Sequence, residues 1–251
     1  MVTLKTKEEI AIMSVGGKML ADVIRKVSDE AREGVSLKAL DTLAEKLIRQ
    51  AGAVPAFLGY RPHGAGKPYP ATICASVNDI IVHAVPTQYK LRSGDVLKLD
   101  FGLRHEGFCL DAAVTVAIGK VSAEATRLIE TTKKALLLGI KAAQPGNHLG
   151  DIGAAIATYV RGKKFGIAEG LTGHGIGHEL HEDPSVYNFG KTGAGMELVP
   201  GLVIAIEPMT TVGSGKLVQL PDDSYATADS SLSAHFEHTI AITEKGPMIL
   251  T

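Results

Sequence analysis

The segment from Gly94 to Ile118 is the part of this sequence that most constrains its fold. It contains two short apolar runs separated by the polar residues Arg104 to Gly107, a pattern typical of a β-hairpin. With a loop centred in the middle of those four residues, Asp100 lies directly opposite Asp111. Residues opposite each other on one face of a hairpin are about 5 Å apart, and like charges repel there. The pair therefore needs a positive partner, which Lys98 would supply in an ordinary salt-bridged surface patch.

Composition narrows the class of protein. The 251 residues are 45% hydrophobic and 21% charged, which allows one large domain, or two closely packed halves, with a sizeable core. The formal net charge of -1 and the absence of a nucleic-acid-binding motif give no indication of a nucleic-acid partner. Two cysteines, Cys74 and Cys109, cannot form a disulfide framework and fit a reducing compartment. The N-terminus lacks a signal peptide and no apolar run could span a membrane, so we expect a cytoplasmic protein.

Capping residues and the spacing of apolar side chains predict four helices. Thr6 and Glu9 have the spacing of a capping box, and Ser36 and Ser122 are typical N-cap residues. The helices are expected over about residues 6–34, 36–52, 122–138 and from 149 onward. A strand is expected at 72–76, and the end of the chain is expected to consist of strands and glycine-rich turns.

The second half of the chain repeats features of the first half in the same order. The matching pairs are Gly34-Val-Ser-Leu37 with Gly146-Asn-His-Leu149, His83-Ala-Val-Pro86 with His181-Glu-Asp-Pro184, Gly94 to Asp100 with Gly201 to Glu207, and Asp111 with Glu237. These matches predict a duplicated unit of two helices, a His-x-x-Pro turn and two strands that each carry one acid. Folded about a pseudo-two-fold axis, the unit would bring four acids and two histidines to one central sheet. We expect a single domain over 1–251, with halves of about 1–120 and 121–251.

The acids and one further histidine favour a metal centre. His174, which lies among glycines, adds a nitrogen ligand to Asp100, Asp111, Glu207 and Glu237. Four carboxylates match the charge of two divalent cations, and the same cluster buried without cations would be strongly destabilising. Oxygen-rich ligation with one imidazole favours Mn²⁺, Fe²⁺, Co²⁺ or a catalytic Zn²⁺ pair over a closed structural zinc site. Each residue alone also fits an ordinary turn or surface position, but together they would require five coincidences.

Such a centre would support hydrolysis. Two metal ions about 3.5–4 Å apart can activate water as hydroxide and polarise a carbonyl or phosphoryl oxygen. His83 and His181 lie on equivalent turns and would then act from either side of the reacting group. For an amide substrate, one histidine would contact the peptide nitrogen and the other the developing oxyanion. Glu207 could both bind metal and carry a proton to the leaving amine. The sequence has no Ser-His-Asp order, Walker loop or His-Glu-x-x-His motif to supply competing chemistry.

At these residues the chain resembles the type I methionine aminopeptidases, which are peptidases of the pita-bread fold. The resemblance covers essentially the whole length. It rests on Ser76-Val77-Asn78-Asp79 leading to His83, Gly94-Asp95 leading to Asp100, Gly173 to Gly177, Ile206-Glu207-Pro208-Met209, and Ser231 to Thr239. It implies an α+β fold in which a pseudo-two-fold duplicated unit forms a central curved antiparallel sheet flanked by helices.

The resemblance also implies an activity and a site. The activity is removal of the initiator methionine from nascent proteins whose second residue is small, by attack of a metal-activated hydroxide on the peptide carbonyl. The implied metal ligands are Asp100, Asp111, His174, Glu207 and Glu237, with Asp111 and Glu237 bridging two ions drawn from Co, Mn, Fe, Zn or Ni. The implied catalytic residues are His83, His181 and Glu207, and the two histidines also contact substrate. The implied partners are nascent N-termini and, transiently, the ribosome, and we expect a monomer.

A methionine side chain requires an apolar and polarisable pocket. By position we build it from Phe57, Tyr60, Tyr69, Cys74, Leu180 and Tyr225, although all six would also make ordinary packing contacts. The sequence departs from the family pattern here, because it has no tryptophan near Tyr225 and has Leu180 where an aromatic residue often stands. His178 replaces a frequent arginine, and Gly64 to Pro68 resembles an insertion. These departures concern the pocket shape and the preference at the second residue, and they leave the implied metal ligands unchanged.

Three other functions remain open. A proline-specific peptidase of the aminopeptidase P or prolidase kind has the same five ligands, but usually carries an additional N-terminal domain. The predicted first helix, beginning at about residue 6, leaves no room for one. A metal-free pita-bread module that binds peptides would typically have lost ligands. Phosphoester hydrolysis would require a cluster of arginine or lysine in the motifs, which is missing.

Overall fold

The computed structural model describes residues 2–61 and 67–251. The helices of these residues are α1 (Lys7–Glu30), α2 (Leu37–Gln50), α3 (Ala123–Ala142) and α4 (Leu149–Gly162). The strands are β1 (Val54–Pro55), β2 (Ile73–Val77), β3 (Ile80–Val82), β4 (Val96–His105), β5 (Phe108–Ala117), β6 (Gly166–Ile167), β7 (Gly173–Gly175), β8 (Glu182–Val186), β9 (Val203–Ile206), β10 (Met209–Thr211), β11 (Leu217–Gln219), β12 (Tyr225–Thr227), β13 (Ser233–His235), β14 (His238–Thr243) and β15 (Gly246–Ile249). The predicted insertion at Gly64 to Pro68 lies largely outside the described residues.

The helix starts follow the predicted capping residues. The Thr6 side chain accepts from the backbone of Glu9, and the Glu9 carboxylate accepts from the backbone of Thr6, which confirms the capping box. Ser36 and Ser122 cap α2 and α3 through their hydroxyls. α3 is longer than predicted because its buried face continues to Ile140. None of the helices in the described residues is long and apolar enough to cross a membrane.

The β4–β5 hairpin forms as predicted, but its register differs by two residues. Asp100 pairs with Ala113, and Asp111 pairs with Gly102, so the two acids are not directly opposite. The turn is centred one residue later than expected because Glu106 and Gly107 both adopt positive φ, at 46° and 89°. A two-residue turn with positive φ at both positions matches the twist of the flanking strands. The acids still share one face, since side chains alternate with a period of two.

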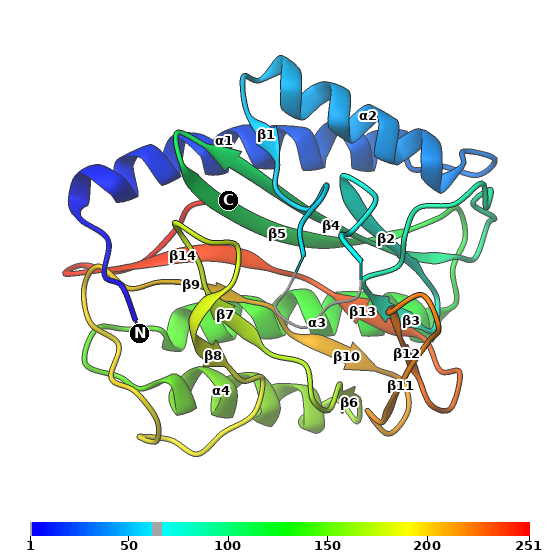
Figure 1. Ribbon diagram of the computed structural model, residues 1–251. Coiled ribbons are helices and arrows are strands. Elements are labelled where there is room, and N and C mark those ends of the chain that lie inside the picture. The colour runs from blue at the N-terminus through cyan, green and yellow to red at the C-terminus, as the bar shows by residue number, and fades with distance from the viewer. Residues whose placement is uncertain (1, 62–66) are drawn as a thin grey trace.

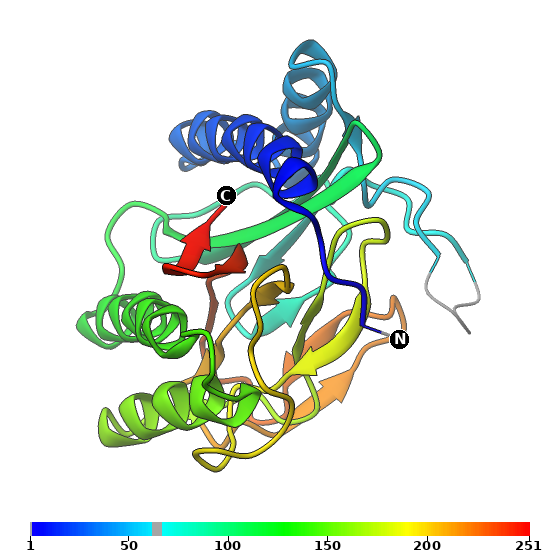
Figure 2. The same cartoon turned by 90° about the vertical axis from the view of Figure 1, so that its left-hand side faces the viewer.

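Two layers of helices enclose the antiparallel sheets. One of the two larger sheets has the order β1-β4-β2 with β5 beside β4, and the other has the order β15-β14-β9-β7-β8; two three-stranded sheets in the described residues have the orders β13-β10-β6 and β11-β12-β3. The pair α1 and α2 covers the side of β4 and β5, and the pair α3 and α4 lies on the opposite side of the molecule (Figures 1 and 2). The predicted α+β architecture of antiparallel sheets flanked by four helices is confirmed. The division into halves at about residue 120 stays a prediction.

Hydrogen bonds join the two sheets at the place where the acids lie. The Glu237 backbone N–H donates to the oxygen of Ala113 at 2.9 Å. The Thr239 hydroxyl donates to the backbone oxygen of Asp111 at 2.8 Å and accepts from the Asp111 N–H at 3.1 Å. These contacts connect β5 with the start of β14. They therefore fix Asp111 and Glu237, which are distant in the sequence, beside each other.

The segment before α1 supports the opposite side of the site. Lys5 is buried and forms an ion pair with Glu182, which also accepts from the Glu179 backbone N–H at 3.0 Å. Because Glu182 directly follows His181, this contact braces the turn that carries His181. A buried charge requires such a partner, since an unpaired ammonium inside a protein is strongly unfavourable.

Two helical glycines provide a test of this packing. A Cβ at Gly17 in α1 would lie 2.0 Å from the backbone oxygen of Leu250, whereas a Cβ at Gly162 in α4 meets no atom within 4 Å. Glycine to alanine normally favours a helix by about 1 kcal/mol. We expect Gly17→Ala to lower the free energy of unfolding by about 1–3 kcal/mol through overpacking, and Gly162→Ala to raise it slightly. Urea denaturation measures both, and equal effects of the two changes would contradict the packing.

Candidate metal centre

The four predicted acidic ligands come from four separate segments. Asp100 lies in β4 and Asp111 in β5, as expected for the hairpin. Glu207 directly follows β9, and Glu237 lies in the short break between β13 and β14. The expectation that each acid lies inside a strand is therefore wrong for these two glutamates. Because the backbone leaves the sheet at a strand end, both side chains are free to turn toward the hairpin.

The structure brings these acids and His174 to one place. One ligand atom each of Asp111, His174 and Glu237 lie within 4.8 Å of one another. His174 Nε2 is 3.8 Å from Asp111 Oδ2 and 3.7 Å from Glu207 Oε1. Asp100 shares the hairpin face of Asp111, and the charge of Glu207 contributes to raising the Asp100 pKa. All five side chains lie at least partly inside the protein.

The His174 imidazole is oriented by its own backbone. Its Nδ1 is 2.8 Å from the Gly175 oxygen. A carbonyl oxygen only accepts hydrogen bonds, so Nδ1 carries the proton and Nε2 has a free lone pair. That lone pair faces the acids. A histidine whose second nitrogen donates to a backbone oxygen is the usual arrangement for a metal ligand.

The acids are in an environment that opposes their charge. Burial, together with the charge of Glu207, raises the pKa of Asp100 to about 6, and burial raises the pKa of Glu207 to about 7. Burial and the neighbouring carboxylates raise the pKa values of Asp111 and Glu237 well above their usual range. Within the described residues, Asp100 Oδ1, Asp111 Oδ1 and Glu237 Oε1 have no hydrogen-bond partner. Buried oxygens of this kind, beside a free imidazole lone pair, fit divalent cations.

The first predicted catalytic histidine, His83, follows β3. Its backbone adopts φ of 65°, a left-handed conformation that is uncommon for a residue with a side chain. Its ring meets the edge of the Tyr225 ring, with centroids 5.9 Å apart. Burial, and then the charge of His235, lower the His83 pKa to about 4. The imidazole is therefore neutral at pH 7.

The second predicted catalytic histidine, His181, immediately precedes β8. Its ring centroid is 4.3 Å from that of His174, so it lies directly beside the candidate metal ligands. The Tyr60 hydroxyl is 2.7 Å from His181 Nδ1. Burial, then the neighbouring His174 and His83, lower the His181 pKa to about 3. This imidazole is also neutral at pH 7.

The remaining pocket candidates lie close to these groups. The Phe57 and Tyr69 rings meet edge to face at 6.5 Å, and the Tyr69 hydroxyl donates to two backbone oxygens at 3.0 Å. Cys74 in β2 pairs with Asp100 in β4. Leu180 is buried next to His181. Tyr60, Tyr225 and Cys74 thus lie beside His181, His83 and Asp100, and the role of all six candidates toward a ligand stays a prediction.

The sequence interpretation missed His235. In the structure it is 1% exposed, and its Nε2 lies 3.4 Å from Glu207 Oε2. Its position two residues before Glu237 is the signal that could have indicated a place beside the acids, because residues two apart in an extended segment share a face.

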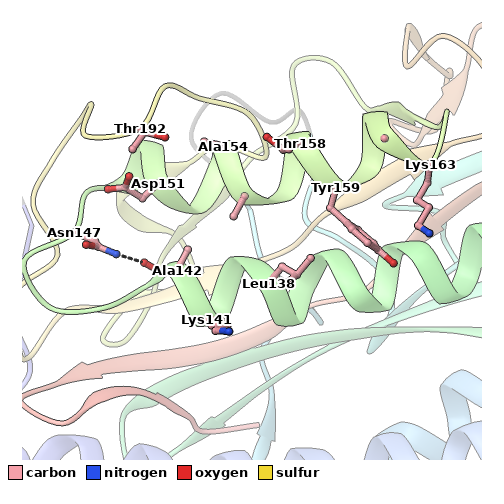
Figure 3. A pocket seen from close by; sticks show the side chains of 12 residues that line it. Leu138, Lys141, Ala142, Asn147, Asp151, Ala154, Thr158, Tyr159, Lys163 and Thr192 are labelled. Carbon is pink, nitrogen blue, oxygen red and sulfur yellow. Dashed lines mark hydrogen bonds between the residues drawn. The ribbon is translucent and has the colours of Figure 1, made fainter.

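A hollow on the surface lies away from the candidate metal centre. It measures about 850 Å³ and lies along α3 and α4, as Figure 3 shows. Its lining residues include Asp151, Tyr159 and Lys163, and none of the candidate site residues. Leu138 comes from α3 and Ala154 from α4, so the hollow is a groove between the two helices. It therefore contributes nothing to the metal centre.

Comparison with known proteins decides the family. Residues 11–244 match metallopeptidase family M24. The chain belongs to this family. The M24 chain is 41% identical over 252 residues to a methionine aminopeptidase of Clostridium perfringens, covering 100% of this chain and 99% of that protein. It is 43% identical over 258 residues to methionine aminopeptidase 1 of Mycobacterium tuberculosis, covering 100% of this chain and 95% of that protein.

Solved structures agree with the sequence comparison. The crystal structure of a Thermotoga maritima methionine aminopeptidase superposes with a TM-score of 0.95 at 37% identity, covering 100% of this chain and 99% of that one. The predicted membership of the methionine aminopeptidases, and with it the pita-bread fold, is confirmed. A Xaa-Pro dipeptidase from Bacillus anthracis superposes with a TM-score of 0.79 at 23% identity, covering 99% of this chain and 61% of that one. At that identity the likeness shows a shared fold alone.

The buried acids predict how stability depends on pH. The Asp100 pKa is raised from 3.8 to about 6 and the Glu207 pKa from 4.5 to about 7. An acid whose pKa is higher in the folded state stabilises the fold below its unfolded pKa, and this contribution is lost as pH rises through the folded pKa. We expect the metal-free protein to lose stability between about pH 4 and pH 7, and added divalent cation to restore it. Thermal unfolding of chelator-treated protein measures this. A metal-free stability that rises over that range would contradict the charge repulsion.

Proposed function

We propose that this protein hydrolyses the peptide bond after an N-terminal initiator methionine when the second residue is small. The observation that carries the proposal is the buried group of Asp111, His174 and Glu237, in a chain similar over its whole length to methionine aminopeptidases. Its substrates are then the N-termini of nascent polypeptides. Transient ribosome association, a monomeric state and a cytoplasmic location remain predictions from the family resemblance.

We assign the metal to the five converging side chains. Asp100, Asp111, His174, Glu207 and Glu237 would hold two divalent cations. When bound, the cations supply Lewis-acid chemistry, because they polarise a carbonyl oxygen and lower the pKa of water. The mixture of carboxylates with one imidazole suits Co, Mn, Fe, Zn and Ni, and does not choose among them.

Tyr60 gives His181 its chemical role. A phenol donates readily to an imidazole nitrogen, which is the stronger base of the two, so the Tyr60 O–H donates to His181 Nδ1. The proton of the neutral His181 ring is then on Nε2, which faces away from Tyr60. An N–H donor beside the acids is suited to stabilise negative charge on the carbonyl oxygen of the scissile bond. We therefore assign to His181 the stabilisation of the oxyanion that develops on this carbonyl oxygen.

His83 and Glu207 take the remaining roles. The left-handed backbone of His83 and the Tyr225 ring against it restrict where this imidazole can point. We assign to it the contact with the peptide nitrogen of the scissile bond, on the side opposite to His181. Glu207 Oε1 lies 3.7 Å from His174 Nε2, so this carboxylate is placed beside the other assigned ligands. We assign to it the transfer of a proton to the leaving amine.

The alternatives have weaker support. A Xaa-Pro peptidase is supported by fold likeness alone, at 23% identity. A metal-free peptide-binding module would have no reason to gather buried carboxyl oxygens without hydrogen-bond partners, such as those of Asp100 and Asp111. A phosphoesterase would need cationic side chains among the site residues, and the assigned set has none.

Peptide cleavage tests the substrate assignment. We expect the metal-reconstituted protein to release methionine from Met-Ala-Ser and to leave peptides of the form Xaa-Pro uncut, because the assigned pocket accepts a methionine side chain. Product release followed by chromatography measures both. Asp111→Asn, treated identically, is the control for a contaminating peptidase and should show no turnover. Faster cleavage of Xaa-Pro peptides would assign the protein to the proline-specific relatives.

Replacement of His83 tests whether it acts on substrate or on metal. We expect His83→Ala to lower kcat by about 100-fold or more, with bound metal unchanged, because the imidazole is assigned to the peptide nitrogen. Metal content by atomic absorption and steady-state kinetics give the two readings. His105→Gln, at the tip of the β4–β5 hairpin, is the matched control. Parallel losses of metal and activity in His83→Ala would make His83 a ligand or a structural residue.

A further inference from the structure

The His235 side chain is polar, buried and unexplained. It is 1% exposed, and neither of its ring nitrogens has a hydrogen-bond partner in the described part of the chain. Leaving a buried polar group unpaired costs about 1–3 kcal/mol. A group of this kind in a native protein calls for a specific reason, such as a role toward an ion or another side chain.

The position of this imidazole is fixed by its backbone. The Thr115 hydroxyl donates to the His235 backbone oxygen at 2.6 Å and accepts from the His235 N–H at 2.9 Å. His235 also pairs with Met209 in β10. The residue is thus held from β5 on one side and from β10 on the other. Its ring faces the acids because the strands direct it there.

Two histidines flank the Glu207 carboxylate, one at each oxygen. His174 Nε2 is 3.7 Å from Oε1, and His235 Nε2 is 3.4 Å from Oε2. The two imidazoles differ in what fixes their protons. His174 carries its proton on Nδ1 and donates it to the Gly175 backbone oxygen, so the Nε2 atom of His174 has a free lone pair.

His235 has no such acceptor at Nδ1 among the described residues. Glu207 is the carboxylate that lies within 4.0 Å of its ring in that part of the chain. A neutral imidazole places its proton on the nitrogen that faces an acceptor. Asp100, His83 and Lys98 also influence the ring by their charge, but a carboxylate oxygen at 3.4 Å from Nε2 is the acceptor that the geometry offers.

We propose that His235 is a positioning residue for Glu207, whose Oε2 accepts from His235 Nε2–H while Oε1 is presented to the metal. The proposal rests on the assignment of Glu207 as a ligand. With one oxygen tied to a fixed imidazole, the carboxylate cannot rotate, so the other oxygen is held ready beside His174 Nε2. Partners of this kind typically account for about 10–100-fold in metal affinity.

Metal affinity tests the proposal without any substrate. His235→Gln keeps an N–H donor at a similar reach, and His235→Leu removes it. By calorimetric titration with Mn²⁺, we expect the leucine variant to bind about 10–100-fold more weakly and the glutamine variant to stay within a few-fold of the natural protein. His238→Leu is the matched control, since His238 lies three residues on and its Nδ1 is paired with Thr251 Oγ1 at 3.0 Å. Equal losses in the glutamine, leucine and control variants would overturn the proposal.

Unfolding of the metal-free protein separates positioning from general support of the fold. Leucine removes a buried imidazole whose Nδ1 has no hydrogen-bond partner in the described residues, so we expect His235→Leu to be at least as stable as the natural protein without metal. A structural role would lower stability and metal affinity together. A marked loss of metal-free stability in His235→Leu would therefore count against the proposal.

Tautomers measured by NMR distinguish a positioning residue from a direct ligand. Long-range ¹H–¹⁵N spectra of histidine-labelled protein, with and without Zn²⁺, report which ring nitrogen carries the proton. We expect His235 to be protonated at Nε2 and His174 to be unprotonated there, so that His174 serves as an internal reference. A Zn²⁺-bound, unprotonated His235 Nε2 would overturn the proposal and make His235 a ligand. Neither binding nor NMR depends on peptide cleavage, so failure to release methionine would reject the proposed function separately.

Discussion

The whole structure depends on holding like charges together in one buried volume. Carboxylates taken out of water repel each other and lose hydration, and the raised pKa of Asp111 and of Glu237 expresses both effects. The fold offsets this repulsion with backbone contacts across its centre, where Glu237 bonds to Ala113 and Thr239 bonds to Asp111. The acids are therefore arranged by the scaffold around them, and their own interactions oppose that arrangement.

Local chemistry in the sequence predicted much of this scaffold. The capping box at Thr6 involves neighbouring residues only, so its geometry follows from their identity. The hairpin was also evident, but its register was not, because two turns of similar length compete and the choice depends on Glu106 accepting positive φ. The duplicated pattern located the acids in the sequence, although it could not indicate that Glu207 and Glu237 lie just beyond strand ends.

Contacts between distant residues account for what the sequence did not reveal. The bond between Tyr60 and His181 joins residues that are 121 positions apart, and no local pattern announces it. His235 was missed for the same reason, since its surroundings are set by Thr115, which lies 120 positions earlier. Residue types at matching positions can thus indicate that a metal centre exists. Which ring nitrogen of each histidine carries the proton depends instead on neighbours that only the folded structure brings together.

The ion pair between Lys5 and Glu182 has a consequence for the order of folding. The Lys5 ammonium and its buried partner Glu182 are far apart in the sequence, so the pair forms only after the intervening segments have folded between them. The last residues are also needed, because the Leu250 N–H donates to the backbone of Thr239 at 2.9 Å. Contacts of such long range close late in folding. A chain that has not yet brought both of these segments into contact therefore lacks a finished centre, so the site is completed late in folding.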